Sequence, residues 1–160
     1  MGSSPISSTF NVLDREVMNP MPWYDTHGLR FIHPEGWQVE RETDGDDWQV
    51  TVQSPESAFI LIKPLGPIED LDEAAEVTLE TMREDYKDLE EEAAEEIIGG
   101  VTCRGYDVNF TCLDLITTCQ IRYLRAGDEA VLIMSQAADI DPPEYQIEME
   151  RLRRSISIQS

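Results

Sequence analysis

Three cysteines and two histidines are the residues whose chemistry depends most on their neighbours. The cysteines are Cys103, Cys112 and Cys119, and the histidines are His27 and His33. Zinc sites combine closely spaced Cys pairs with nearby His residues, whereas these histidines lie far upstream of all three thiols. We therefore expect no metal site and interpret the cysteines as buried, apolar, free thiols in a reducing compartment. A Cys112–Cys119 disulfide would require a long hairpin loop between the two residues.

The chain contains none of the common catalytic or cofactor motifs. GxxxxGK[ST], GxGxxG and GxSxG are all absent, so no phosphate loop, dinucleotide loop or nucleophile elbow is predicted. Residues 44–47 resemble part of a calcium loop but lack the remaining ligand positions, which favours a solvated turn. We expect no catalytic residues and no cofactor.

Acidic side chains are concentrated in one part of the chain. Residues 69–96 hold fourteen of the 33 Asp and Glu residues and only two basic residues, and so account for more than half of the formal net charge of −21. The simplest interpretation is a solvated helix face that keeps the protein soluble. The sharper hypothesis is a docking face for a basic protein partner, steered by long-range charge. Its candidate partner-binding residues are Glu73, Glu76, Glu80, Glu84 and Asp88.

Composition limits the class of protein further. A chain of 160 residues with 41% apolar residues has the size and core of one ordinary domain. The strong negative charge argues against nucleic acid or an anionic membrane surface as a partner, because both require a basic face. No segment approaches the about 20 apolar residues of a membrane span, and no signal peptide is visible. We therefore expect a cytoplasmic protein.

Hydrophobic periodicity predicts strands, a helix, more strands and a final helix. Alternation and turn residues predict strands near residues 29–32, 37–39, 48–53, 58–63, 93–98, 102–112, 115–125 and 129–137. Asp70 and Glu73 have capping-box spacing, and an apolar stripe predicts a helix that continues to about Leu89. Asp141 is the expected cap of the second helix, whose buried stripe runs from Tyr145 to Ile156.

Short turns between strands imply antiparallel pairing, and two amphipathic helices need a sheet to cover. The predicted fold is α+β, an antiparallel sheet of about six to eight strands covered by two main helices. Residues 1–25, rich in Ser and Pro, are expected to form a flexible tail, and residues 26–160 a single domain.

The order of elements resembles the PsbP-like superfamily. The residues that suggest this are Gly28 to Trp37, which look like that family's opening hairpin with its Pro-x-Gly-Trp turn. The helix after Pro67, the Gly99–Gly100 turn before Tyr106 and the C-terminal helix look similar too. The resemblance covers about residues 28–157 and implies an α/β/α sandwich. It also implies a binding or assembly role, with no partner or binding residue carried over.

Three functions remain open at this stage. The leading hypothesis is a non-catalytic protein-binding or adaptor domain that docks a basic partner. The alternative is a module for a small or apolar ligand, with a pocket between sheet and helix. A hydrolase using dispersed carboxylates is the weakest, because 33 acidic residues bring carboxylates together by chance. The sequence does not indicate an oligomeric state.

Overall fold

The computed structural model describes residues 21–159, which form ten strands and two helices. In chain order the elements are β1 (Trp23–Thr26), β2 (Leu29–Ile32), β3 (Gln38–Asp44), β4 (Asp47–Gln53), β5 (Phe59–Pro67), α2 (Leu71–Asp85), β6 (Glu90–Ile98), β7 (Val101–Cys112), β8 (Leu115–Ala126), β9 (Glu129–Ala138), α3 (Glu144–Ser155) and β10 (Ser157–Ile158).

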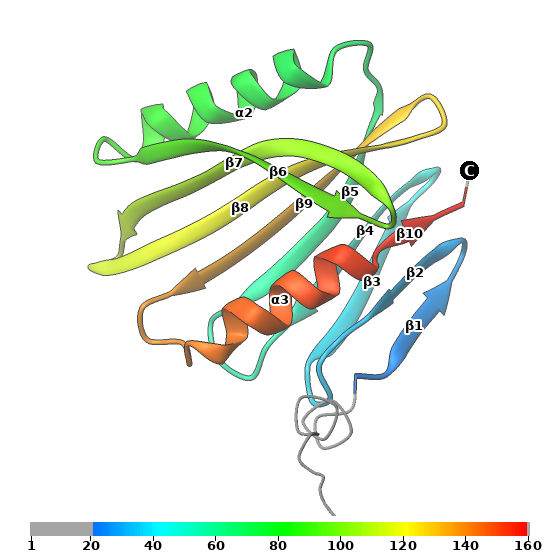
Figure 1. Ribbon diagram of the computed structural model, residues 1–160, viewed down its shortest axis with the longest axis horizontal. Helices are drawn as coiled ribbons and strands as arrows, with labels where there is room; N and C mark the ends of the chain where they lie inside the picture. The colour runs from blue at the N-terminus through cyan, green and yellow to red at the C-terminus, as the bar shows by residue number, and fades with distance from the viewer. Residues whose placement is uncertain (1–20, 160) are drawn as a thin grey trace, which may run out of the picture.

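Seven of these strands form one antiparallel sheet in the order β3-β4-β5-β9-β8-β7-β6. The other three form a small sheet in the order β1-β2-β10. β9 is the central strand of the large sheet, as its nearly continuous apolar sequence predicts. The α+β fold with a sheet of six to eight strands and two covering helices is thus confirmed (Figure 1).

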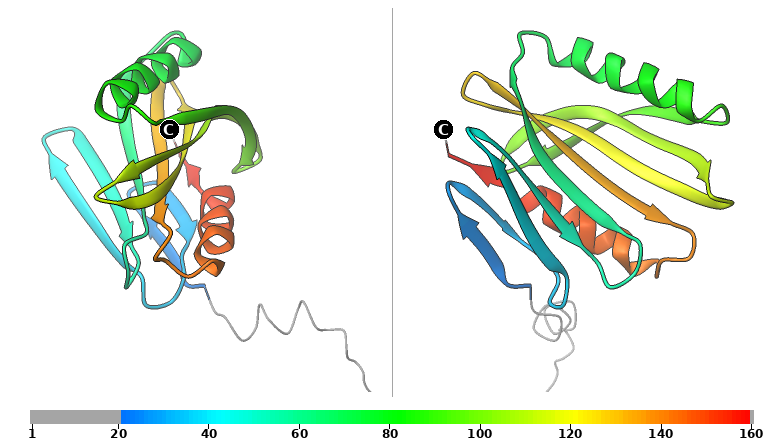
Figure 2. Two further views of the ribbon diagram at one scale, coloured as in Figure 1. Left: turned by 90° about the vertical axis from the view of Figure 1, so that its left-hand side faces the viewer. Right: turned by 180° about the vertical axis from the view of Figure 1, so that it is seen from behind.

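The two helices lie on opposite faces of the large sheet (Figures 1 and 2). Side chains alternate across each strand, so Cys119 and Ile121 of β8 join the core under α2. Leu124, on the other face of β8, joins the second core, which includes Met149 and Leu152 of α3. The small sheet packs beside α3, and Phe31 of β2 belongs to the same core.

The opening segment differs from the expected hairpin. The turn at Glu35–Gly36 is present, but β2 pairs with β1 and β10, whereas β3 pairs with β4. Pro34, which has no N–H to donate, is buried between the two strands, and the chain changes sheet there. β1 begins at Trp23, inside the segment 1–25 that the sequence analysis assigns to the tail; residues 1–20 of that segment lie outside the described residues.

Helix α2 begins where its capping residue predicts but ends earlier. The Asp70 carboxylate accepts hydrogen bonds from the backbone N–H groups of Asp72 and Glu73. The helix ends at Asp85 rather than near Leu89, because Tyr86 is extended and the chain then turns into β6. The predicted apolar stripe nevertheless continues past the end of the helix, because Tyr86 packs against the same core and stacks on Phe110 with ring centroids 4.2 Å apart.

Helix α3 does not use the predicted cap. It begins at Glu144 without a side-chain hydrogen bond at its N-terminus. The Asp141 carboxylate instead accepts from the backbone N–H groups of Ser57 at 2.9 Å and Ala138 at 2.8 Å. Asp141 therefore fastens the β4–β5 loop to the end of β9, a long-range contact that replaces the local cap.

The hairpin between β7 and β8 keeps Cys112 and Cys119 too far apart along the strands to form a disulfide bond. Leu113 and Asp114 form a tight turn with φ values of 52° and 65°, so Cys112 lies opposite Leu115. Cys119 lies farther along β8, where its cross-strand neighbour on β7 is Val108. The disulfide is absent, and all three cysteines are free thiols.

Candidate functional site

Four of the five predicted partner-binding residues share one exposed face of α2. Glu73, Glu76, Glu80 and Glu84 follow one another at spacings of three or four residues, which places them on the same side of the helix. All four are exposed, while Ala75 and Leu79 are buried against the sheet. Within residues 21–159, Glu73, Glu80 and Glu84 form no ion pair. Their charge is therefore available to a partner.

Asp88, the fifth predicted residue, lies in the turn between α2 and β6. Its carboxylate accepts from the backbone N–H of Thr111 on β7, at 3.1 and 3.3 Å. The Thr111 hydrogen bonds lower the pKa of Asp88. The contact stabilises the turn, so Asp88 has a structural role that the four helix residues lack.

Arg83 connects the acidic helix to the neighbouring edge strand. Its guanidinium lies 3.1 Å from Glu76 and donates from Nε to Glu91 of β6 at 2.8 Å. β6 is an edge strand of the large sheet, and Glu91 and Glu95, its exposed acids on the α2 side, continue the negative surface of the helix. We call these residues together the acidic face, which comprises Glu73, Glu76, Glu80, Glu84, Glu91 and Glu95.

A groove of about 1140 Å³ opens between the first half of α2 and the β6–β7 pair. Leu71 and Ala75 line it from the helix, and Ala93, Tyr106 and Tyr123 line it from the sheet. This is the place where the sequence-based alternative puts a pocket for an apolar ligand. The groove is open, however, and carboxylates stand on both of its sides.

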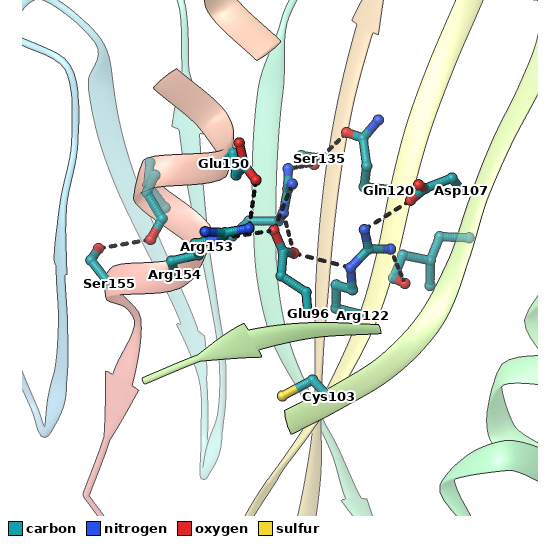
Figure 3. A network of polar contacts seen from close by, with 12 residues as sticks. Glu96, Cys103, Asp107, Gln120, Arg122, Ser135, Glu150, Arg153, Arg154 and Ser155 are labelled. Carbon is teal, nitrogen blue, oxygen red and sulfur yellow. Dashed lines mark hydrogen bonds and ion pairs between the residues drawn. The ribbon is translucent and has the colours of Figure 1, made fainter. Parts of the chain in front are cut away.

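The other face of the sheet contains an ion-pair network that the sequence analysis did not identify (Figure 3). Glu96 of β6 is buried and accepts from Nε of Arg122 on β8 at 3.0 Å. It also accepts from Nε and Nη2 of Arg153 on α3, at 2.8 and 3.1 Å. Arg122 further contacts Asp107 at 2.8 Å, and Arg153 donates to Ser135 at 2.8 Å. The network joins four strands of the sheet, β6 to β9, to α3.

Burial by itself would raise the pKa of Glu96, but the hydrogen bonds and charges of Arg153 and Arg122 outweigh it and hold that pKa below its ordinary value. Both arginines are about 95% buried, and each is engaged by Glu96 and further oxygen atoms. The network therefore offers no free group for chemistry. Glu96 lies within the acidic segment 69–96 of the sequence, but it is buried and does not contribute to the exposed acidic surface.

Two of the three thiols are buried, and the described residues hold no cluster suited to a metal ion. Burial raises the pKa of Cys103 to about 11 and that of Cys119 to about 12, so both are neutral thiols at neutral pH. Residues 21–159 hold no group of three or more His, Cys, Asp or Glu side chains able to bind a metal ion. Over the same residues, neither helix has the length and apolar character needed to cross a membrane.

Comparisons with known proteins give similarity in structure only. The sequence matches no protein-family model and no curated protein at a significant level. Among solved structures, the Ran-binding protein Mog1p of Saccharomyces cerevisiae is similar with a TM-score of 0.59 and 14% identity, over 88% of this chain and 96% of that chain.

Two further structures support the same fold. A Mog1 single-substitution variant matches with a TM-score of 0.54 and 16% identity, over 85% of this chain and 86% of that one. A protein of Bacteroides thetaiotaomicron matches with a TM-score of 0.55 and 13% identity, over 83% of this chain and 46% of that longer chain. The fold is therefore similar to that of Mog1p.

Proposed function

We propose that this protein is a protein-binding module that docks a basic partner on the acidic face. The observation that carries the proposal is the row of Glu73, Glu76, Glu80 and Glu84, exposed on α2 with only Glu76 engaged by an arginine. A protein with a net charge of −21 attracts cationic partners over a distance of about one Debye length, near 8 Å in physiological salt.

The similarity to Mog1p adds support from the fold. That protein is described as Ran-binding, so at least one domain of this architecture presents a surface to another protein. At 14% identity the similarity identifies no partner for this chain. The proposal for the partner's chemistry therefore rests on the charge of the acidic face.

The test is affinity capture of partners from the protein's own host, at low and at high salt. We expect a stoichiometric basic partner that is retained at low salt and released at high salt, because exposed charges more than a Debye length apart are screened. A variant with glutamine at Glu73, Glu76, Glu80 and Glu84 should lose that partner.

A matched control removes the same charge elsewhere. Glutamine at Glu35, Glu40, Glu56 and Glu144 changes four exposed glutamates on other elements and leaves α2 intact. We expect this variant to keep the partner. Equal capture by the wild type and both variants, or equal loss in both variants, would contradict docking on α2.

A further inference from the structure

The groove beside α2 exists because the helix is held above small residues. The second half of α2 packs closely, with Leu79 in the core that also contains Val108 and Phe110. Opposite the first half, β6 presents only the small side chain of Ala93, which lies beside Tyr106 of β7. A hollow remains under this part of the helix.

A tyrosine holds that hollow open. The Tyr123 hydroxyl, which rises from β8, is hydrogen-bonded to the Thr78 hydroxyl and lies 3.4 Å from the Ala74 carbonyl oxygen. The tyrosine therefore supports the helix from below.

The rim of the groove is anionic on both sides. Glu69, Asp70 and Asp72 stand on the helix side, and Glu95 stands on the β6 side. Arg104 lies between them, with its guanidinium 3.2 Å from Asp72 and 3.5 Å from Glu95. All three side chains of this bridge are about two-thirds exposed, so solvent screens it and an incoming cation can compete for the same carboxylates.

We propose that the groove receives an extended basic segment of the partner, with one large apolar side chain seated over Ala93 and Tyr106. Lysine or arginine residues on either side of that anchor would contact Asp72 and Glu95. Charge complementarity selects this occupant, because an apolar floor with Asp72 on one side and Glu95 on the other matches an apolar residue flanked by cations. The second arginine of the lining, Arg125, is engaged by the backbone carbonyl oxygens of Ile68 and Glu69. The inference rests on the proposed function and adds to it the place and the chemistry of the contact.

The test uses two labelled synthetic peptides in fluorescence anisotropy. One has two lysines on each side of a phenylalanine, and the other has serine in place of the phenylalanine. We expect the phenylalanine peptide to bind at least about tenfold more tightly, the effect of burying one aromatic side chain. Affinity for both peptides should fall with salt.

The decisive variant is Ala93→Phe, which fills the groove without changing the charge. Ala93 is exposed and lies opposite Tyr106 on the groove side of the sheet. We expect this variant to lose the preference for the phenylalanine peptide. Asn109→Phe adds the same ring to an exposed position of β7 outside the groove lining and should leave the preference unchanged.

A second variant keeps the test informative if Ala93→Phe fails to fold. Asp72→Asn with Glu95→Gln leaves the groove open and removes both rim carboxylates that hold Arg104. This variant should bind both peptides more weakly and with a shallower dependence on salt, while the phenylalanine preference persists.

The results separate this inference from the proposed function. Equal binding of the two peptides, no binding of either, or an unchanged preference in folded Ala93→Phe would overturn the groove as the contact. Docking on the acidic face would still stand if affinity capture remained sensitive to the four glutamates of α2. Loss of that sensitivity would overturn the proposed function itself.

Discussion

At the scale of single residues, Glu96 provides the sharpest test of the structure. It is buried between Arg122 and Arg153, and its removal leaves two guanidinium groups without their main counter-charge. We expect Glu96→Gln to lower the free energy of unfolding by about 3–5 kcal/mol, as measured in urea. Glu92→Gln changes an exposed acid of the same strand and should alter it by no more than about 0.5 kcal/mol. Equal effects of the two substitutions would place Glu96 outside the interior.

The same carboxylate predicts a dependence of stability on pH. The folded-state pKa of Glu96 is below its ordinary value of 4.5, so its ionised form stabilises the folded protein above that pH. This contribution is lost as the pH falls through the folded-state pKa. The difference in unfolding free energy between the wild type and Glu96→Gln should therefore shrink below about pH 4.5. A difference that is constant from neutral to acidic pH would contradict the ion-pair network.

The alternation of apolar and polar residues along the strands predicts which side chains lie in the core. Phe110 and Ile133 are almost fully buried, one in each core. We expect Phe110→Ala and Ile133→Ala each to cost about 2–5 kcal/mol in urea unfolding. Ile116→Ala, on an exposed isoleucine of β8, is the control and should cost little. Near-zero effects at the two buried sites would mean that the strand faces are assigned incorrectly.

Burial of Glu96 could not be read from its local sequence. It is one of fourteen acids in residues 69–96, and nothing in its immediate neighbours separates it from exposed Glu95. Its strand position shares a face with buried Ile98, which is the only local signal. Its partners are 26 and 57 residues away in sequence. Long-range pairing of this kind requires the topology of the sheet.

At the scale of elements, the start of α2 depends on a single side chain. Asp70 satisfies two backbone N–H groups that have no partner within the helix. We expect Asp70→Ala to lower the unfolding free energy by about 0.5–2 kcal/mol, and Asp70→Asn to have a much smaller effect, since asparagine also caps helices. Both substitutions remove the same charge. An equal loss in both would assign the effect to charge rather than to capping.

Strand β7 depends on the absence of a side chain at Gly105. A Cβ atom there would overlap the Ile121 carbonyl oxygen on β8, and the paired backbones cannot separate without breaking ladder hydrogen bonds. We expect Gly105→Ala to destabilise the protein by at least about 1–3 kcal/mol in thermal or urea unfolding. Asn109→Ala, at an exposed position of the same strand, should be close to neutral. A neutral Gly105→Ala would contradict the β7–β8 register.

Local patterns predicted most elements, and their failures share a physical cause. The Asp70 cap, the Leu113–Asp114 turn and the central position of β9 follow from short-range chemistry and alternation. Asp141 was expected to cap α3, but Ser57, on a distant loop, competes for its carboxylate. The separation of β2 from β3 is also invisible locally, because the partner strand β10 comes from the far end of the chain.

At the scale of the whole molecule, the net charge of −21 opposes folding through self-repulsion. Ion pairs among residues 21–159 offset part of this repulsion, but exposed pairs such as Arg83–Glu76 contribute little. Raising the ionic strength from about 0.01 M to about 0.15 M shortens the Debye length from about 30 Å to about 8 Å. We therefore expect the Tm to rise with salt over this range, by about 2–4 °C for each 1 kcal/mol of repulsion relieved.

The acidic face should account for a large share of that rise, because its glutamates are close together on α2 and β6. The variant with glutamine at Glu73, Glu76, Glu80 and Glu84 should have a higher Tm at low salt and a shallower dependence on salt. Glutamine at Glu35, Glu40, Glu56 and Glu144 removes equal charge from dispersed positions and should change the slope less. Equal slopes in the two variants would mean that net charge alone matters. The clustering on α2 would then carry no energetic cost that a basic partner could relieve by binding there.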